Sequence, residues 1–180
     1  GLDKSIILKE KYYEYDENIF RDYHSIKRKI NSLKDLKKNS SLIKKLENTI
    51  TIFHAKVVKD ITKGLNINLI GFHGQTIYHN PQEKISLQLG NGNLLSQLTK
   101  KKIVFNFRQN DINNGGEGAP LTPIFHKYLI KSKKISLPAC ILNIGGISNL
   151  TLVQNLNNHE IISEDVGPGN CLINTWIQHH

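Results

Sequence analysis

The sequence predicts an α/β fold of mixed sheets with flanking helices, and two observations carry this prediction. After Gly64, short apolar segments bounded by Gly- and Asn-rich turns alternate with segments of helical periodicity. Glycine and proline are also segregated, because residues 1–64 contain only Gly1 and Gly64 of the 13 glycines and none of the five prolines. We therefore divide the chain into a lysine-rich, mostly helical segment, 1–64, and an α/β segment, 65–180.

The first segment begins with an apolar stretch that predicts a short strand over residues 4–11. A helix is expected over 18–34, where Ile19, Tyr23, Ile26 and Ile30 recur at helical spacing. Residues 36–41 are a polar link. A long amphipathic helix should follow over 41–63, with Gly64 as its stop. Its apolar positions are Ile43, Leu46, Ile50, Phe53, Val57 and Ile61.

The second segment predicts six strands and three helices. The strands are expected over 68–72, 85–89, 103–107, 139–144, 150–153 and 160–164. The helices are expected over 93–100, 121–131 and 169–177. Loops at the strand ends of such a fold are the expected place for a site.

Composition limits the function classes. The net charge of +9 comes from 21 Lys but only 3 Arg, beside 20 Asn and 25 Ile. Arg is the residue that reads phosphates and bases bidentately, so a solvated lysine surface is favoured over nucleic-acid binding. No stretch approaches the roughly 20 apolar residues of a membrane helix. With only Cys140 and Cys171 and no apolar leader, we expect a cytoplasmic protein with no membrane partner.

Two Gly-containing stretches carry polar side chains suited to bind a ligand. In residues 71–76, a buried strand ends in His73, Gln75 and Thr76, which offer donors and acceptors for hydroxyl groups. The alternative is a turn with a hydrogen-bonded histidine. In residues 106–121, Arg108 and Asp111 precede a Gly-Gly-Glu-Gly sequence and a helix start, which favours an anion-binding loop. A mobile surface loop with a salt bridge is the alternative.

Two further motifs lie nearer the end of the chain. Residues 142–150 read as two strands joined by Gly145-Gly146, a turn that can hold polyphosphate or can simply be a hairpin. In residues 164–170, Asp165 stands before a glycine-rich helix entry. It is either a general base, with Mg²⁺ held through water as a further option, or a helix cap. No zinc spacing, Walker loop or Ser-His-Asp order appears, so we assign no metal-binding residue.

Together, HGQT, FR-x-x-D-I-x-x-GG-x-G-APL-x-P, NIGGISNL and D-x-GPGN resemble, in order and spacing, the anhydro-N-acetylmuramic acid kinases. The resemblance covers residues 71–177. It implies an actin-like, hexokinase-like (ribonuclease H-like) ATPase fold, here incomplete, with ATP and Mg²⁺ in a cleft. It also implies an alcohol-directed phosphotransferase of cell-wall (peptidoglycan) recycling. Such an enzyme opens the 1,6-anhydro ring of the amino sugar with water and phosphorylates its 6-oxygen to give N-acetylmuramic acid 6-phosphate.

The resemblance assigns roles by position. Asp165 becomes the general base that activates water. Gly145, Gly146, Ser148 and Asn149 resemble the second phosphate loop, which would bind ATP. The expected substrate-binding residues are His73, Gln75, Thr76, Arg108, Asp111, Glu117, Gly167 and Asn170. Arg108 is the candidate for charge recognition, its target being either the lactyl carboxylate of the sugar or a protein carboxylate.

The sequence also departs from the family. Asn110 and Asn174 stand where many members carry Arg and Asp. The head of the first phosphate loop and the later adenosine motif are missing, so we do not expect the 180 residues to be active without those loops. An inactive relic or a sugar-binding module is therefore the competing hypothesis, and a basic nucleic-acid module ranks last. A homodimer is a further expectation.

Overall fold

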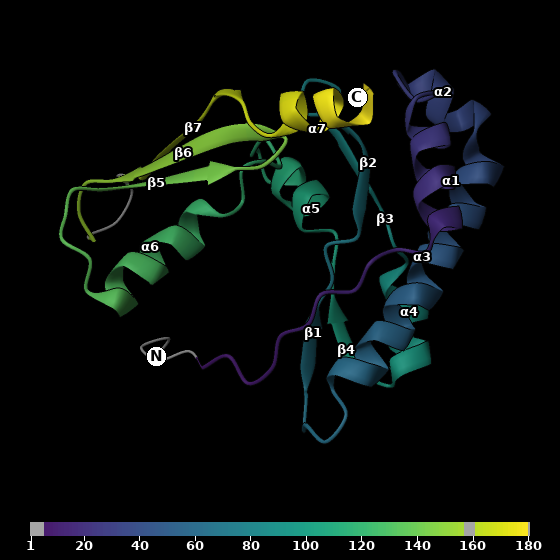
Figure 1. Cartoon of the computed structure of the whole chain (residues 1–180), viewed down its shortest axis with the longest axis horizontal. Helices are drawn as coiled ribbons and strands as arrows, with labels where there is room; N and C mark the ends of the chain where they lie inside the picture. Colours follow the sequence, from purple (N-terminus) through teal and green to yellow (C-terminus); the bar gives the residue numbers. More distant parts are fainter. Residues whose placement is uncertain (1–5, 157–160, 180) are drawn as a thin grey trace. The chain divides into compact units, whose positions relative to one another are not determined.

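The computed structural model describes residues 6–156 and 161–179. Contacts group the chain into two compact units, Ile7–Gly118 and the part from Ala119 onward, and we describe each unit by itself. The compositional change at Gly64 falls inside the first of these units, so the domain division proposed at that residue stays a prediction. The mixed α/β content is confirmed in both units (Figure 1).

Three helices lead the first unit: α1 (Glu17–Lys27), α2 (Leu33–Lys38) and α3 (Ser40–Ile61). The long helix predicted over 41–63 is thus confirmed as α3. The prediction of one helix over 18–34 and a polar link over 36–41 is wrong, because the Ser32 side chain accepts the Asp35 N–H (3.3 Å) and caps a separate helix there.

The strand predicted over 4–11 is wrong for its described part, since residues 6–16 have no regular structure. Ile6, Ile7 and Leu8 are 72–80% exposed, so no neighbouring strand covers their apolar side chains. Further along, Lys11 and Tyr13 tie the segment to Asp60 of α3 through hydrogen bonds of 2.7 and 2.6 Å. Residues 4 and 5 lie outside the described residues.

The helices α1 and α3 pack on a β-hairpin. Strand β2 (Gln75–Asn80) pairs antiparallel with β3 (Ile85–Leu89), and their Ile77 and Leu89 side chains are fully buried beside Ile50 of α3. Strand β3 is confirmed over its full predicted range. Strand β2 was not predicted, because its only apolar pair, Ile77 and Tyr78, lies among polar residues.

A second cluster joins α3 to the rest of this unit. Ala55, Phe72 and Leu95 are buried together, linking α3 to helix α4 (Gly92–Thr99). Strand β1 (Leu69–Gly71) pairs in parallel with β4 (Lys102–Val104). The strand predicted over 103–107 ends early, because the chain turns through Asn106 (φ 61°) into a short helix, α5 (Phe107–Asn113).

The second unit is a three-stranded antiparallel sheet with a helix against it. The order is β5 (Ala139–Ile144), β6 (Ile147–Val153), β7 (Ile161–Pro168). Helix α6 (Pro123–Lys133) packs on β6 and β7, and the buried Ile130, Ala139 and Val153 form the core. Helix α7 (Cys171–His179) follows. The strand predicted over 139–144 is confirmed as β5. Strand β6 begins three residues before the predicted 150, and β7 continues four residues past the predicted 164, so both strands extend into the glycine motifs.

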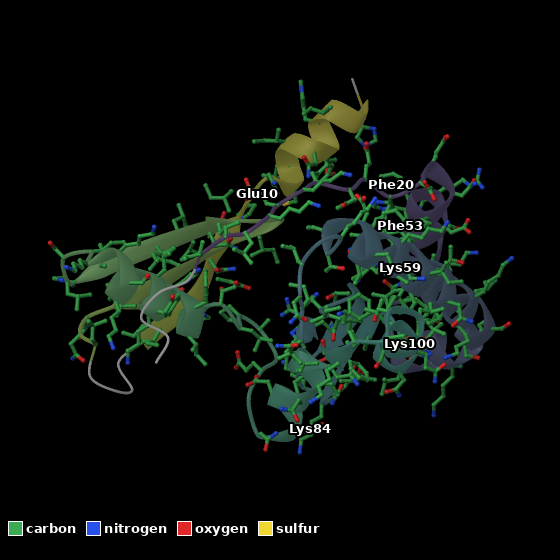
Figure 2. The ribbon with its side chains drawn as sticks, turned by 90° about the horizontal axis from the view of Figure 1, so that it is seen from below. Glu10, Phe20, Phe53, Lys59, Lys84 and Lys100 are labelled. Atoms are coloured by element: carbon green, nitrogen blue, oxygen red, sulfur yellow. The ribbon has the colours of Figure 1, made fainter. Side chains whose placement is uncertain are left out.

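The surface has the character predicted from composition. Lys59, Lys84 and Lys100, labelled in Figure 2, are all exposed, in agreement with a solvated lysine-rich surface. Of the helices in the described residues, none has both the length and the apolar character needed to cross a membrane.

Candidate functional site

The first unit joins His73, Arg108 and Asp111 in one hydrogen-bonded cluster. Arg108 Nε donates to His73 Nε2 (2.9 Å), and its Nη1 donates to the carbonyl of Gly118 (2.8 Å). The Gly118 N–H in turn donates to Asp111 Oδ2 (2.8 Å). Arg108 therefore links the segment between β1 and β2 to the glycine loop, although 35 residues separate it from His73.

The two partners of His73 suit one tautomer of a neutral imidazole. Its Nδ1 lies 2.9 Å from the Gly74 carbonyl, which can only accept, while its Nε2 faces the Arg108 donor. Both bonds form together when the ring is neutral and carries its proton on Nδ1. Partial burial lowers the pKa of Arg108, yet a guanidinium stays charged at any ordinary pH.

Two glycines of this loop, Gly116 and Gly118, are closely packed. A Cβ on Gly116 would collide with the Asp111 carboxylate, and one on Gly118 (φ 73°) would lie 2.9 Å from Ile112 Cδ1. Gly116 and Gly118 thus pack around the Asp111 carboxylate. Glu117 belongs to the same loop and is exposed. Within the described residues no carboxylate forms an ion pair with Arg108, so the protein-carboxylate target considered for it is not seen.

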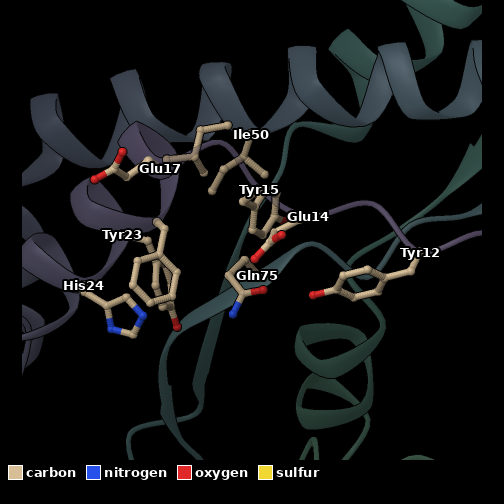
Figure 3. Close-up of a pocket in the computed structure, with 10 residues that line it drawn as sticks. Tyr12, Glu14, Tyr15, Glu17, Tyr23, His24, Ile50 and Gln75 are labelled. Atoms are coloured by element: carbon tan, nitrogen blue, oxygen red, sulfur yellow. The ribbon is translucent and has the colours of Figure 1, made fainter. Parts of the chain in front are cut away.

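Gln75 and Thr76 lie on β2, next to this cluster in sequence but with other partners. The Thr76 carbonyl accepts from Tyr23 Oη (2.7 Å), and Thr76 Oγ1 accepts from Gln88 Nε2 (3.4 Å). Gln75 lines a surface cavity of about 720 Å³, shown in Figure 3, with side chains from α1, α3 and the segment before α1. The other lining residues include Tyr12, Glu14, Tyr15, Tyr23 and His24.

In the second unit, the third and fourth motifs are bonded to each other. The Gly169 N–H donates to the Gly146 carbonyl and the Asn170 N–H to the Gly145 carbonyl, both at 2.9 Å. Gly169 is packed so tightly here that a Cβ would collide with the Gly145 carbonyl oxygen, whereas nothing lies within 4 Å of a Cβ on Gly146. The Gly-Gly turn between β5 and β6 is therefore hydrogen-bonded to Gly169 and Asn170, while the space where a Gly146 side chain would lie is empty.

Asp165 stands directly opposite Asn149, on neighbouring strands of this sheet. The register pairs Asn149 with Asp165 and Ser148 with Gly167, so Val166 is an extra residue and forms a β-bulge. Directly opposite side chains in an antiparallel pair lie about 4.5–5.5 Å apart at Cβ. Asp165 is exposed, while Asn149 Oδ1 is buried and has no hydrogen-bond partner among the residues that the structure describes. The Ser148 hydroxyl reaches the Pro168 carbonyl at 3.4 Å.

The candidate residues thus form two groups, one in each unit. The first contains His73, Arg108 and Asp111, with Glu117 in the same loop and Gln75 and Thr76 on the adjacent strand. The second contains Gly145, Gly146, Ser148, Asn149, Asp165, Gly167 and Asn170. Sequence reasoning did not single out Gly118 and Gly169 as contact positions. Their glycine motifs were visible, but the backbone partners of those glycines were not.

Comparison with known proteins gives a consistent result. The family model described as anhydro-N-acetylmuramic acid kinase matches residues 6–180. Among curated relatives, the anhydro-N-acetylmuramic acid kinase of Pelagibacter ubique (strain HTCC1062) is 55% identical over an alignment 192 positions long. The alignment covers 100% of this chain and 51% of the relative. The proteins of that name from Brucella canis (strain ATCC 23365 / NCTC 10854 / RM-666) and Agrobacterium fabrum (strain C58 / ATCC 33970) are 40% and 34% identical. They are matched over 83% and 94% of this chain, and over 41% and 47% of their own lengths.

This chain therefore spans about half the length of the curated relatives it matches. The four motifs that suggested the resemblance all lie within the matched range. On the family match and on the identity to these relatives, the chain belongs to the anhydro-N-acetylmuramic acid kinase family.

Proposed function

We propose that the protein carrying this chain is an ATP-dependent kinase of 1,6-anhydro-N-acetylmuramic acid, with the actin-like, hexokinase-like fold of such ATPases. The observation that carries the proposal is the pairing of Asn149 with Asp165 beside the Gly145–Gly146 turn. The carboxylate that would activate water and the turn that would receive phosphate are neighbours in one sheet. Family membership supplies the substrate class, and the proposed role is cell-wall recycling.

In this reaction the Asp165 carboxylate takes a proton from water, whose oxygen attacks the anomeric carbon of the sugar. The bond from that carbon to the 6-oxygen breaks, and the freed 6-oxygen receives the phosphoryl group. ATP supplies that group when it is bound. The product is N-acetylmuramic acid 6-phosphate, which contains the elements of one water in addition to the phosphoryl group. Asp165 suits this role because it is exposed at the bulge of β7.

The Gly145–Gly146 turn fits a phosphate group. Space is open at Gly146, and the Ser148 hydroxyl lies on the following strand. Backbone N–H groups and a hydroxyl at a glycine turn are suited to hold phosphate oxygens. A magnesium ion is expected with the nucleotide. Because the described residues contain no group of three His, Cys, Asp or Glu side chains placed to hold a metal, we assign the ion no ligand among them.

In the first unit, the proposed task of the His73–Arg108–Asp111 cluster is to bind the sugar. Arg108 uses Nε and Nη1 within the protein, which leaves Nη2 to face a ligand carboxylate such as the lactyl group. Gln75, Thr76 and Glu117 would contribute hydrogen bonds to hydroxyl or amide groups. In the second unit, Gly167 (φ 151°) and Asn170 would contribute to sugar binding beside Asp165.

The test supplies 1,6-anhydro-N-acetylmuramic acid, ATP and Mg²⁺ to the natural protein that carries this sequence. Mass spectrometry should detect a sugar heavier by one phosphate and one water. Asp165→Asn should lower turnover by about 10²- to 10⁴-fold while sugar affinity stays nearly unchanged. Glu164→Gln, which neutralises the neighbouring exposed carboxylate, is the matched control and should retain turnover.

Absence of the phosphorylated product would refute the kinase proposal, and full turnover by Asp165→Asn would refute the assignment of the base. The two competing hypotheses make different predictions. A sugar-binding module would bind the sugar without turning it over, and an inactive relic would show no cooperative unfolding. No observation favours either over the kinase. A homodimer is also proposed from the resemblance alone.

A further inference from the structure

A row of polar side chains runs through the small core of the second unit. Thr151 of β6 is fully buried and His126 of α6 is 8% exposed, although the surrounding core is apolar. Thr151 Oγ1 lies 2.8 Å from His126 Nδ1 and 3.3 Å from the Ser163 hydroxyl of β7. One hydroxyl thus connects α6, β6 and β7, the elements that Figure 1 shows packed together at this end of the chain.

Such a cluster needs an explanation, because buried polar groups add little to the stability of a core even when they are hydrogen-bonded. Burial lowers the pKa of the His126 imidazole, so the ring is neutral near pH 7 and can donate to or accept from the Thr151 hydroxyl. The three side chains satisfy one another only when Thr151 stands opposite Ser163, which is the observed register. The cluster therefore stabilises the register of β6 and β7 in which Thr151 pairs with Ser163.

That pairing decides where Asp165 lies. Residues two apart in a strand share a face, so Asp165 is on the same face as Ser163, and Asn149 is on the same face as Thr151. The Thr151–Ser163 pair and the Asn149–Asp165 pair are therefore adjacent on one face of the sheet. The bulge at Val166 follows directly after the second pair. A slip of β7 by one residue would move the Asp165 side chain to the opposite face of the sheet.

We propose that His126, acting through Thr151 and Ser163, is a positioning residue that sets the register of β7 and so holds Asp165 on the reactive face. His126 itself touches no reactant. The inference rests on the proposed role of Asp165 as the base. It adds that a buried hydrogen-bonded cluster holds this carboxylate in position next to a bulge, where regular strand pairing ends.

The experiment compares pairs of variants in the natural protein. Thr151→Val removes the hydroxyl at nearly constant volume, while Thr151→Ser keeps the hydroxyl and removes the methyl group. His126→Leu removes the ring nitrogen, while His126→Asn keeps a hydrogen-bonding atom near the place of Nδ1. Ser132→Ala is the control for a hydroxyl in α6, because within the described part of the chain the Ser132 hydroxyl donates to the carbonyl of Leu129 in its own helix and to no other group.

We expect Thr151→Val and His126→Leu to lower kcat by about 10- to 100-fold with KM for the sugar little changed, as for misplacement of a catalytic group. Thr151→Ser, His126→Asn and Ser132→Ala should keep kcat within about threefold of the wild type. Equal losses in Thr151→Val and Thr151→Ser, or unchanged kcat in Thr151→Val and His126→Leu, would overturn the proposal.

A second measurement separates this inference from the kinase proposal and from simple unfolding. Cross-strand amide contacts between β6 and β7, followed by NMR in the folded fraction, should persist in Thr151→Ser and shift or vanish in Thr151→Val. If the wild type shows no turnover, the proposed function fails, but these contacts still report whether the cluster sets the register. Native contacts in folded Thr151→Val would contradict the inference regardless of activity.

Discussion

At the scale of single residues, Arg108 offers the sharpest test of the first unit. It donates from two nitrogens to acceptors on different segments, His73 and Gly118. A lysine carries the same charge but cannot reach both acceptors, so Arg108→Lys should weaken sugar binding by about tenfold or more. Calorimetric titration with the sugar measures this. Arg21→Lys is the control, because Arg21, exposed on α1, hydrogen-bonds Asn18 of its own helix and no other side chain among the described residues. Equal affinities in both variants would contradict the prediction.

Asp60 provides a pH-dependent prediction. Hydrogen bonds from Lys11 and Tyr13, together with the Lys11 charge, lower the pKa of this carboxyl to about 2 from its ordinary value of 3.8. The contribution of the ionised Asp60 to stability is therefore complete above that ordinary value, and it is lost as the pH falls toward 2. Lys11→Met should raise the titration midpoint of Asp60 in carboxyl NMR, whereas Lys100→Met should not. An unchanged midpoint in Lys11→Met would contradict the hydrogen-bonded assignment.

At the scale of elements, the junction of the β5–β6 turn with the entry to α7 depends on one glycine. A Cβ on Gly169 would collide with the Gly145 carbonyl, which is backbone and cannot rotate away, so Gly169→Ala should destabilise this unit by about 1–3 kcal/mol. Gly146→Ala is the matched control. Its Cβ would meet no atom within 4 Å, so the change should stay within about 0.5 kcal/mol. Denaturant unfolding gives both values, and similar losses in the two variants would argue against the close contact.

The elements also show what sequence periodicity can and cannot predict. Helix α3 was predicted because its apolar residues recur every three or four positions and Gly64 follows it. Strands β3 and β5 were predicted because short apolar segments are bounded by Gly or Pro. The short helix α5 was missed, since it has seven residues and only Ile112 is buried. The strand over 4–11 failed for the opposite reason, because an apolar run becomes a strand only when a partner covers it.

The site was predictable as a set of motifs and unpredictable as geometry. Histidine, arginine and glycine motifs singled out His73, Arg108 and Asp165 as candidates because four patterns occurred in family order. The contact of His73 with Arg108 spans 35 residues and depends on the β1–β2 connection reaching α5, which no local pattern encodes. The polar cluster around Thr151 was invisible for the same reason: its three members lie on three elements, and each looks ordinary in its own segment.

At the scale of the whole molecule, the two units should differ in stability. The main core of the first unit buries nine of the described residues, with a second cluster of three, whereas the core of the second unit buries three, Ile130, Ala139 and Val153. Large apolar side chains are more than half exposed in the second unit, including Leu142, Ile144, Ile147 and Val166. Local opening is easiest where few apolar contacts are lost.

We therefore expect hydrogen exchange in the 180-residue chain to be faster at the amides of β5, β6 and β7 than at those of α3 and β3. Because the proposed base and phosphate turn lie in the less stable unit, ligands that bind there should add protection mainly to that unit. ATP with Mg²⁺, added to the natural protein, is the probe. Slower exchange in β5–β7 than in α3 before any addition would contradict the ranking of the two cores. Protection by ATP confined to Ile7–Gly118 would contradict the placement of the phosphate turn at Gly145–Gly146.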